Sequence, residues 1–195
     1  MAGLPLVLSL DRVNLTDDQF YHLCEANPTI PLERTASGAL VIMSPVGGES
    51  GAREAGLISL LWLWNRQTGL GEVFSSSTLF RLPQGGDRSP DVAWVERSRW
   101  QGLTPEERAG FVPLCPDFVI ELRSKTDPLR PLQEKMQEYL ASGLRLGWLI
   151  NPQDQQVEIY RGDRAWETVN YPALLSGEEV LPGFELHWPL PTDPS

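Results

Sequence analysis

The sequence predicts an α/β protein in which helices flank a mixed β-sheet. One observation is the order of the expected elements, in which helices and several strands are followed by another helix and two more strands. A second is that Pro90–Val95 and Asp117–Ser124 are rich in Val, Ile and Phe, which is typical of buried strands. With 195 residues, 41% of them hydrophobic, the chain suits one sizeable core. We therefore expect a single domain over residues 1–195, with a flexible tail over 189–195.

The first expected elements are a short helix and a strand. Thr16 with Gln19 three residues later is typical of a capping box, so a helix should begin here and run to about Glu25. Ala39–Met43 has the composition of a strand, and Pro45 should end it.

A long apolar helix is expected next. Gly51–Gln67 is apolar almost all round, which predicts a helix buried on more than one side, and Gly69 is a suitable stop signal. Glu72–Ser75 and Thr78–Leu82 follow as strands, and a short helix capped by Thr104 should lie in the loop between the two strongest strands.

The second half of the chain predicts one amphipathic helix and a pair of strands. Asp127 is the expected cap of a helix with Pro128 at its first position, and Gly143 should end that helix. Leu146–Ile150 and Val157–Tyr160 follow as strands, joined by a turn.

The charge of the chain limits its possible partners. The net charge is −10, and of the 16 basic residues only Lys125 and Lys135 are lysines. Binding of nucleic acid by bulk electrostatics normally needs a surplus of Lys and Arg. Any binding of nucleic acid should therefore be local.

The cysteines and the first residues indicate a cellular compartment. Cys24 and Cys115 lie far apart without the spacing of a zinc site or a disulfide framework, which favours a reducing cytoplasm. The apolar stretch Leu4–Leu10 is short, contains Pro5 and has no basic residue before it, so neither a signal peptide nor a membrane-spanning helix is expected. We expect a cytoplasmic protein without a membrane partner.

Two carboxylates in expected strands are the main candidates for chemistry. Side chains alternate along a strand, so Glu121 shares a face with Arg123 inside a run that otherwise has the composition of a buried strand. A buried carboxylate is costly unless a cation or several donors meet it, which leaves a structural ion pair or a metal. Asp91 stands at the start of a neighbouring strand. If the two strands pair, both carboxylates could hold one hard cation such as Mg²⁺ or Mn²⁺.

The residues around these acids resemble a known family. Ser89–Asp91, followed by Glu121 within Pro116–Ser124, resembles the Uma-type endonucleases of the PD-(D/E)XK superfamily. Other segments are similar to that family in the same order: Ser44–Pro45, Gly47–Glu49, Phe80–Pro83, Lys135–Tyr139 and Gly147–Pro152. The resemblance covers nearly the whole chain and implies a restriction-endonuclease-like core.

The resemblance also implies roles for individual residues. Asp91 and Glu121 match the metal-binding acids of the superfamily, and the backbone carbonyl of Leu122 is a further candidate ligand. Glu49 is suited to the N-terminus of its helix, and it is also a candidate ligand because first-helix acids bind metal in related nucleases. Glu33 ranks after Glu49 in the same role.

The sequence departs from the superfamily where a catalytic lysine is usual. That position, two residues after Glu121, is Arg123, which stays protonated and cannot act as a general base, although it could orient a water molecule or hold a phosphate. Lys135 and Lys125 are the other candidates. We favour Lys135, because it lies at the edge of the apolar stripe of its helix and could reach the face that carries Glu121.

The function expected from these features is a metal-dependent endonuclease that hydrolyses phosphodiester bonds in DNA. The first alternative is a non-catalytic binding or regulatory module that keeps the nuclease fold, which Arg123 and the acidic charge favour. The second is an enzyme acting on a smaller phosphate-containing substrate. A homodimer is possible, since soluble oligomers are often symmetric dimers.

Overall fold

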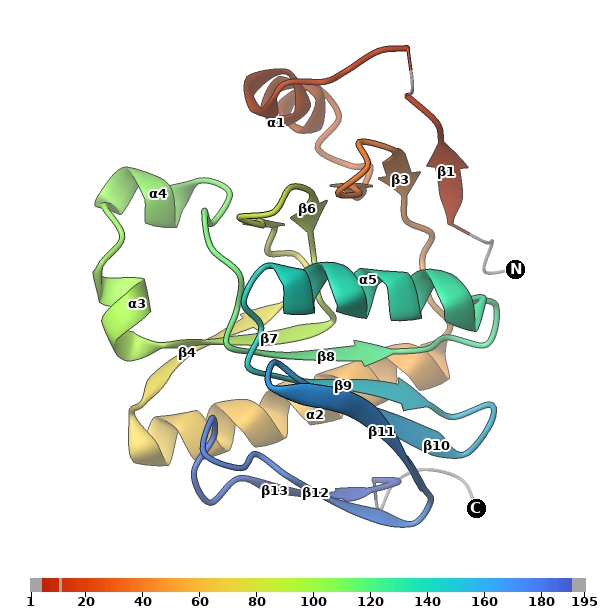
Figure 1. Cartoon of the computed structure of the whole chain (residues 1–195), viewed down its shortest axis with the longest axis vertical. Helices are drawn as coiled ribbons and strands as arrows, with labels where there is room; N and C mark the ends of the chain where they lie inside the picture. Colours follow the sequence, from red (N-terminus) through yellow and green to blue (C-terminus); the bar gives the residue numbers. More distant parts are fainter. Residues whose placement is uncertain (1–4, 11, 191–195) are drawn as a thin grey trace.

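The centre of the molecule is a six-stranded mixed sheet, seen in a computed structural model that describes residues 5–10 and 12–190 (Figure 1). The strand order is β11-β10-β9-β8-β7-β4, and only β8 and β9 pair in parallel. These strands are β4 (Gly71–Ser75), β7 (Val92–Glu96), β8 (Phe118–Leu122), β9 (Leu146–Asn151), β10 (Gln156–Arg161) and β11 (Arg164–Asn170).

Helices cover the two faces of this sheet, as expected for the fold class. Helix α2 (Gly48–Thr68) packs on one face together with the hairpin β12 (Ala173–Ser176) and β13 (Glu185–Trp188), and α5 (Leu129–Ala141) packs on the other (Figure 1). The predicted alternation in β8 is confirmed. Phe118 and Ile120 belong to the hydrophobic cluster on the α2 side, and Val119 to the cluster on the α5 side.

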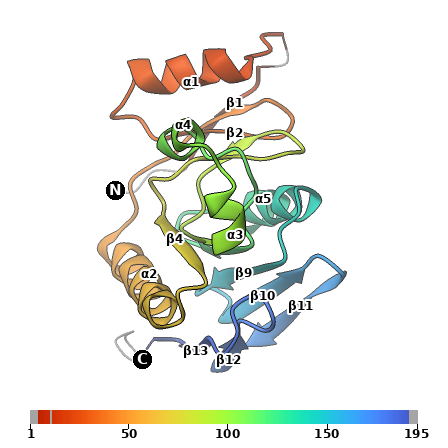
Figure 2. The same ribbon diagram turned by 90° about the vertical axis from the view of Figure 1, so that its left-hand side faces the viewer.

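A second, five-stranded sheet lies on the α5 side of the first, together with α1 (Asp17–Ala26), as Figure 2 shows. Its order is β1-β3-β2-β6-β5. The strands are β1 (Leu6–Leu8), β2 (Leu32–Arg34), β3 (Leu40–Ile42), β5 (Phe80–Arg81) and β6 (Asp87–Arg88). The sequence did not predict β2 and β6, because each is very short and both bury charged side chains, so neither has the apolar alternation of a strand.

The local start and stop signals gave three correct helix ends. Thr16 and Gln19 form a complete capping box at the start of α1, and Thr104 does the same for α4 (Pro105–Ala109). Gly69 ends α2 in the left-handed conformation with φ of 66°. The short α3 (Arg97–Gln101), which follows β7 directly, was not expected.

Two helix predictions were wrong. Helix α2 is buried on one side only, because the sheet covers its Leu57 and Leu61 while Trp62 and Leu63 on the outer side are 45% and 50% exposed. Asp127 does not cap α5. The helix begins two residues later, and the Asp127 carboxylate instead accepts a hydrogen bond from the backbone N–H of Ser124 at 3.1 Å.

The ends of the chain are described in part. Leu190 is 7% exposed and packs against the hydrophobic cluster on the α2 side, whereas residues 191–195 of the expected tail lie outside the described residues, as does Leu4. Within residues 5–10 and 12–190, no helix is both long and apolar enough to cross a membrane.

Candidate active site

The pairing of β7 with β8 brings Asp91 next to Glu121. Val92 is the partner of Ile120, and the same antiparallel register continued by one residue places Asp91 opposite Glu121. The backbone N–H of Leu122 donates to the Asp91 carboxylate at 2.6 Å, which fixes Asp91 against β8. Both acids therefore lie on the face of the sheet that α5 covers.

Helix α5 supplies a lysine to these acids. The Lys135 Nζ lies 2.9 Å from Glu121 and 2.9 Å from Glu33, and it donates to the backbone carbonyl of Ser89 at 3.0 Å. An ammonium has three donors, and these contacts use all of them. One turn along α5, the Tyr139 hydroxyl donates to Glu121 at 3.0 Å. Lys135 and Tyr139 together hold the Glu121 carboxylate from one side.

Glu33 joins the five-stranded sheet to this cluster. Its carboxylate on β2 accepts from Arg88 on β6 at 2.9 Å and from the backbone N–H of Ser89 at 2.9 Å, in addition to Lys135. Arg88 also donates to Glu138 of α5 at 2.6 Å. Three elements distant in the sequence thus meet in one buried ionic network.

The acids of this network have different electrostatic surroundings. Burial, together with the neighbouring charge of Glu121, raises the pKa of Asp91 well above its ordinary value. Burial also raises the pKa of Glu121, where the charge of Lys135 offsets only part of the effect. For Glu33, burial acts in the same direction, but Lys135 and Arg88 outweigh it and the pKa is lowered. The negative charge of Asp91 and of Glu121 is therefore less completely compensated by the protein than that of Glu33.

The lysine is held in its charged form. Burial lowers the pKa of Lys135, but the charges of Glu121 and Glu33 outweigh it, and the net direction is upward. Lys135 is thus a fixed cation at neutral pH rather than a group poised to accept a proton.

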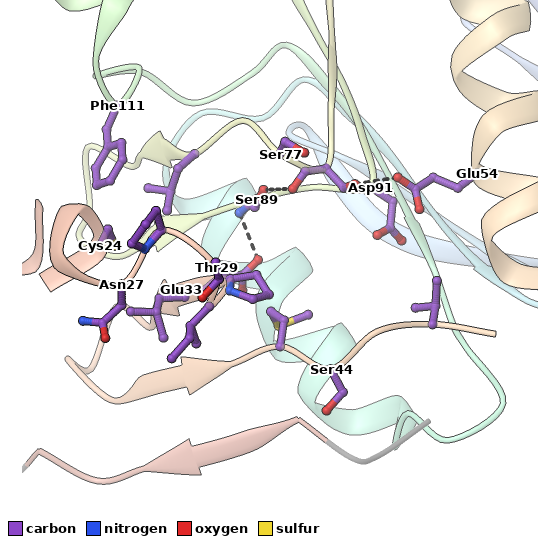
Figure 3. A pocket seen from close by; sticks show the side chains of 18 residues that line it. Cys24, Asn27, Thr29, Glu33, Ser44, Glu54, Ser77, Ser89, Asp91 and Phe111 are labelled. Atoms are coloured by element: carbon purple, nitrogen blue, oxygen red, sulfur yellow. Dashed lines mark hydrogen bonds between the residues drawn. The ribbon is translucent and has the colours of Figure 1, made fainter. Parts of the chain in front are cut away.

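A cavity opens beside Asp91. It has a volume of about 480 Å³ and lies between the five-stranded sheet, the start of α2 and the β4–β5 connection. Figure 3 shows Glu33, Glu54, Ser89 and Asp91 along its wall. A second cavity of about 50 Å³ is lined by both Asp91 and Glu121. The acid pair is therefore enclosed by protein but accessible from the larger cavity through Asp91.

Three of the candidate residues lie elsewhere. The Arg123 guanidinium donates to the backbone carbonyl of Asp127 at 2.9 Å and to Asp154 at 3.0 Å, so it holds the loop after β8 rather than the acids. Lys125 is exposed in that loop. Glu49 is exposed in the first turn of α2 and lines neither of the two cavities.

Sequence reasoning missed two neighbours of the acids. Glu54 of α2 lines the cavity beside Asp91 and adds to the negative potential there. Its signal was the helical spacing, because Glu54 lies three and seven residues before the buried Leu57 and Leu61. Nothing in the sequence indicated that Tyr139 donates to Glu121. A tyrosine in the apolar stripe of a helix is usually interpreted as a residue that packs in the core.

The donor set fits a hard divalent cation. Two carboxylates whose charge the protein compensates incompletely lie side by side. Mg²⁺ binds few protein carboxylates and completes its shell with water and phosphate oxygens. In the part of the chain that the structure describes, no three Asp, Glu, His or Cys side chains gather into a full metal-binding group. Asp91 and Glu121 would therefore hold such an ion together with oxygens that are not side-chain carboxylates.

The sequence model of the Uma2 family, described as "Putative restriction endonuclease", matches residues 17–190. The chain belongs to this family. A crystal structure from Anabaena variabilis, described as "a putative nuclease belonging to DUF820", is similar over 89% of this chain and 94% of that one. The two share 23% sequence identity with a TM-score of 0.72. No curated protein matches the chain.

These findings confirm the resemblance and the fold class. The Uma2 protein has a restriction-endonuclease-like α/β fold, and the family description supports a nuclease-like function. The matched range begins at α1 and ends after β13, so it covers the six-stranded sheet, the five-stranded sheet apart from β1, and the acid site.

Proposed function

We propose that this Uma2 protein is a divalent-metal-dependent endonuclease that hydrolyses phosphodiester bonds in DNA. The observation that carries the proposal is the juxtaposition of Asp91 and Glu121 on paired strands, with the Lys135 ammonium 2.9 Å from Glu121. Family membership supports the nuclease chemistry, and the raised pKa of Asp91 supports a cation as the missing partner of the pair.

Each residue of the site has a distinct part in this reaction. Asp91 and Glu121 would hold Mg²⁺ or Mn²⁺, with the backbone carbonyl of Leu122 as a further candidate oxygen. Such an ion would supply an activated water and neutralise charge that develops on the phosphodiester. Hydrolysis adds water across one P–O ester bond, which leaves a phosphate monoester on one fragment and a hydroxyl on the other.

Lys135 takes the place of the lysine that is absent at position 123. Its three donors are used by Glu33, Glu121 and Ser89, so it acts through its charge and by orienting Glu121. A fixed cation near the reacting phosphate stabilises developing negative charge without reorganisation during the reaction. Tyr139 supports the same orientation of Glu121 through its hydrogen bond.

The test is a cleavage assay with the pure protein. Single-stranded and double-stranded DNA, RNA and a small phosphodiester are incubated with Mg²⁺, with Mn²⁺ or with a chelator. We expect DNA cleavage that requires the metal. Because the chain has only two lysines, Lys125→Ala is a matched control for Lys135→Ala. Lys135→Ala should lower the rate about 10²–10³-fold, as the loss of a preorganised electrostatic group does, whereas Lys125→Ala should leave it unchanged.

Three other results would point elsewhere. DNA binding without cleavage under every metal condition would favour the non-catalytic module. Cleavage of the small phosphodiester alone would favour an enzyme of small substrates. Loss of activity in Lys125→Ala but not in Lys135→Ala would move the role to the loop lysine.

A further inference from the structure

The large cavity beside Asp91 has the dimensions of a ligand site. Its volume of about 480 Å³ falls within the range in which proteins bind small molecules. Its walls come from the α1–β2 connection, the β3–α2 connection and the turn after β4, with Asp91 at one end (Figure 3). A ligand in this cavity therefore lies next to the acid pair.

The acidic walls of this cavity do not suit the binding of several consecutive phosphates of a duplex. Of the described residues that line the cavity, none is Lys or Arg, while Glu33, Glu54 and Asp91 are acidic. The nearby cations are engaged with protein carboxylates, since Arg88 pairs with Glu33 and Glu138. Proteins hold the backbone of a duplex through many contacts from cationic and other donor groups to its phosphates. The walls of this cavity, in a chain with a net charge of −10, do not provide such a set of phosphate contacts.

The remaining lining suits a nucleobase and a sugar. Ile30, Leu79 and Phe111 give an apolar wall, Ser77 adds a hydroxyl group, and the Ser76 hydroxyl donates to Glu54 at 2.6 Å. Proteins that take a single base out of a strand enclose it between apolar or aromatic side chains and bind its edge through hydrogen bonds. Carboxylates and hydroxyls are suitable acceptors for the amino and hydroxyl groups of a nucleoside.

We propose that this cavity binds one unpaired nucleotide of a DNA strand, with its phosphate at the Asp91 end. This inference rests on the proposed function. Single strands, frayed ends and bulged nucleotides are then the substrates. A fully paired duplex is a poor substrate, because each of its nucleotides must first be unpaired and unstacked to enter.

The experiment uses one oligonucleotide in three forms: alone, in a perfect duplex, and in a duplex with one bulged nucleotide. Cleavage is followed with Mg²⁺ or Mn²⁺, and binding is measured separately with Ca²⁺ in place of these ions. We expect the single strand to be cut and bound at least about tenfold better than the perfect duplex, and the bulged duplex to be cut at the bulge.

A blocking variant tests the cavity itself. Ser77 is exposed and lines the cavity, so Ser77→Trp fills part of the space without disturbing the core. It should abolish binding of the single strand in Ca²⁺ and leave Mn²⁺ binding unchanged. Ser59→Trp is the matched control, because Ser59 is exposed on α2 and lines none of the described cavities.

The outcomes separate this inference from the proposed function. Equal binding of the single strand and the duplex, or wild-type binding by Ser77→Trp, overturns the inference even if DNA is cleaved. Preferential binding of the single strand, lost in Ser77→Trp, without cleavage of any form overturns the nuclease proposal and leaves the cavity as a binding site for an unpaired nucleotide.

Discussion

Three buried acids within one network differ in how completely their charge is compensated. Glu33 receives two cationic side chains and one backbone N–H, and its pKa is lowered despite burial. Glu121 shares one of these cations, and Asp91 receives the backbone N–H of Leu122. Burial and like charge therefore raise the pKa of both Asp91 and Glu121. The least compensated acids are those that we assign to the metal.

Glu33→Gln should destabilise the protein, because Lys135 and Arg88 would stay buried with one carboxylate fewer. Removing one partner of a buried ion pair costs about 3–5 kcal/mol of unfolding free energy. Chemical denaturation gives this value. Glu134→Gln is the control, since Glu134 pairs with Arg130 on an exposed helix surface, and the expected loss is under about 0.5 kcal/mol. Equal effects in the two variants would show that Glu33 has no special structural role.

Glu121→Gln should remove divalent-metal binding and leave the fold intact, because the side chain keeps its shape and loses only its charge. The measurement is the heat of Mn²⁺ titration, with circular dichroism as the check on folding. Glu54→Gln and Glu49→Gln compare the two acids of α2. We expect Glu54→Gln to weaken the affinity about 10-fold, as changes near a metal site do, and Glu49→Gln to have the smaller effect. Unchanged titration heat in Glu121→Gln would contradict the metal assignment.

At the scale of elements, α2 and α5 have different tasks. Helix α5 places Lys135 and Tyr139 on Glu121, while its other buried side chain, Met136, packs against the sheet. Helix α2 covers the opposite face of the sheet through Leu57 and Leu61 and leaves an apolar outer side exposed. The position of a leucine around α2, rather than its identity, therefore decides its contribution to stability.

Leu61→Ala and Leu63→Ala make the same chemical change two residues apart. Leu61 is fully buried and Leu63 is 50% exposed. Truncating a buried leucine creates a cavity and costs about 2–5 kcal/mol, whereas an exposed one should cost about 0.5 kcal/mol or less. Thermal or chemical unfolding of both variants measures the difference. A large loss in Leu63→Ala would instead mean that the outer side of α2 is covered in solution.

At the scale of the whole molecule, the acid network joins the two sheets. Glu33 and Arg88 come from the five-stranded sheet, Glu121 from the six-stranded sheet, and Lys135 from the helix between them. The stability of the molecule is thereby linked to the charge state of its site. A cation that binds the acids in the folded state alone must also stabilise the whole protein.

Asp91→Asn should raise the stability of the metal-free protein. A carboxyl whose folded pKa lies above its ordinary value of 3.8 binds protons more tightly when folded, so stability falls as pH rises from that value through the raised pKa. Above the raised pKa the wild type carries this cost in full, and the Asn variant lacks it. We expect the melting temperature of the variant to exceed that of the wild type by a margin that grows as the pH is raised, by about 2–4 °C for each kcal/mol relieved.

Binding of a divalent metal should reverse the order of the two melting temperatures. Mn²⁺ should raise the melting temperature of the wild type and have little effect on Asp91→Asn, because the variant lacks one of the two charged ligands. A wild type whose melting temperature is independent of Mn²⁺, and whose pH dependence is the same as that of Asp91→Asn, would contradict the linkage between Asp91 and the ion.

The local features of this protein follow from its amino-acid sequence alone. The capping boxes at Thr16 and Thr104, the left-handed Gly69 and the alternation along β8 depend on neighbouring residues, and short-range sterics and hydrogen bonding fix them. The ordered segments around Asp91 and Glu121 were also sufficient to indicate the family and the fold.

The contacts between charged groups, in contrast, depend on how distant segments pack together. The sequence left three candidates for the catalytic cation: Lys135, Lys125 and Arg123. The packing of α5 on the sheet brings Lys135 to Glu121, whereas Arg123 pairs with Asp154. The catalytic role of Lys135 stays a prediction. Glu33 reaches the same lysine from 102 residues away in the chain. Such contacts depend on strand pairing and helix packing between distant segments, whereas periodicity and capping report only on residues within a few turns of one another.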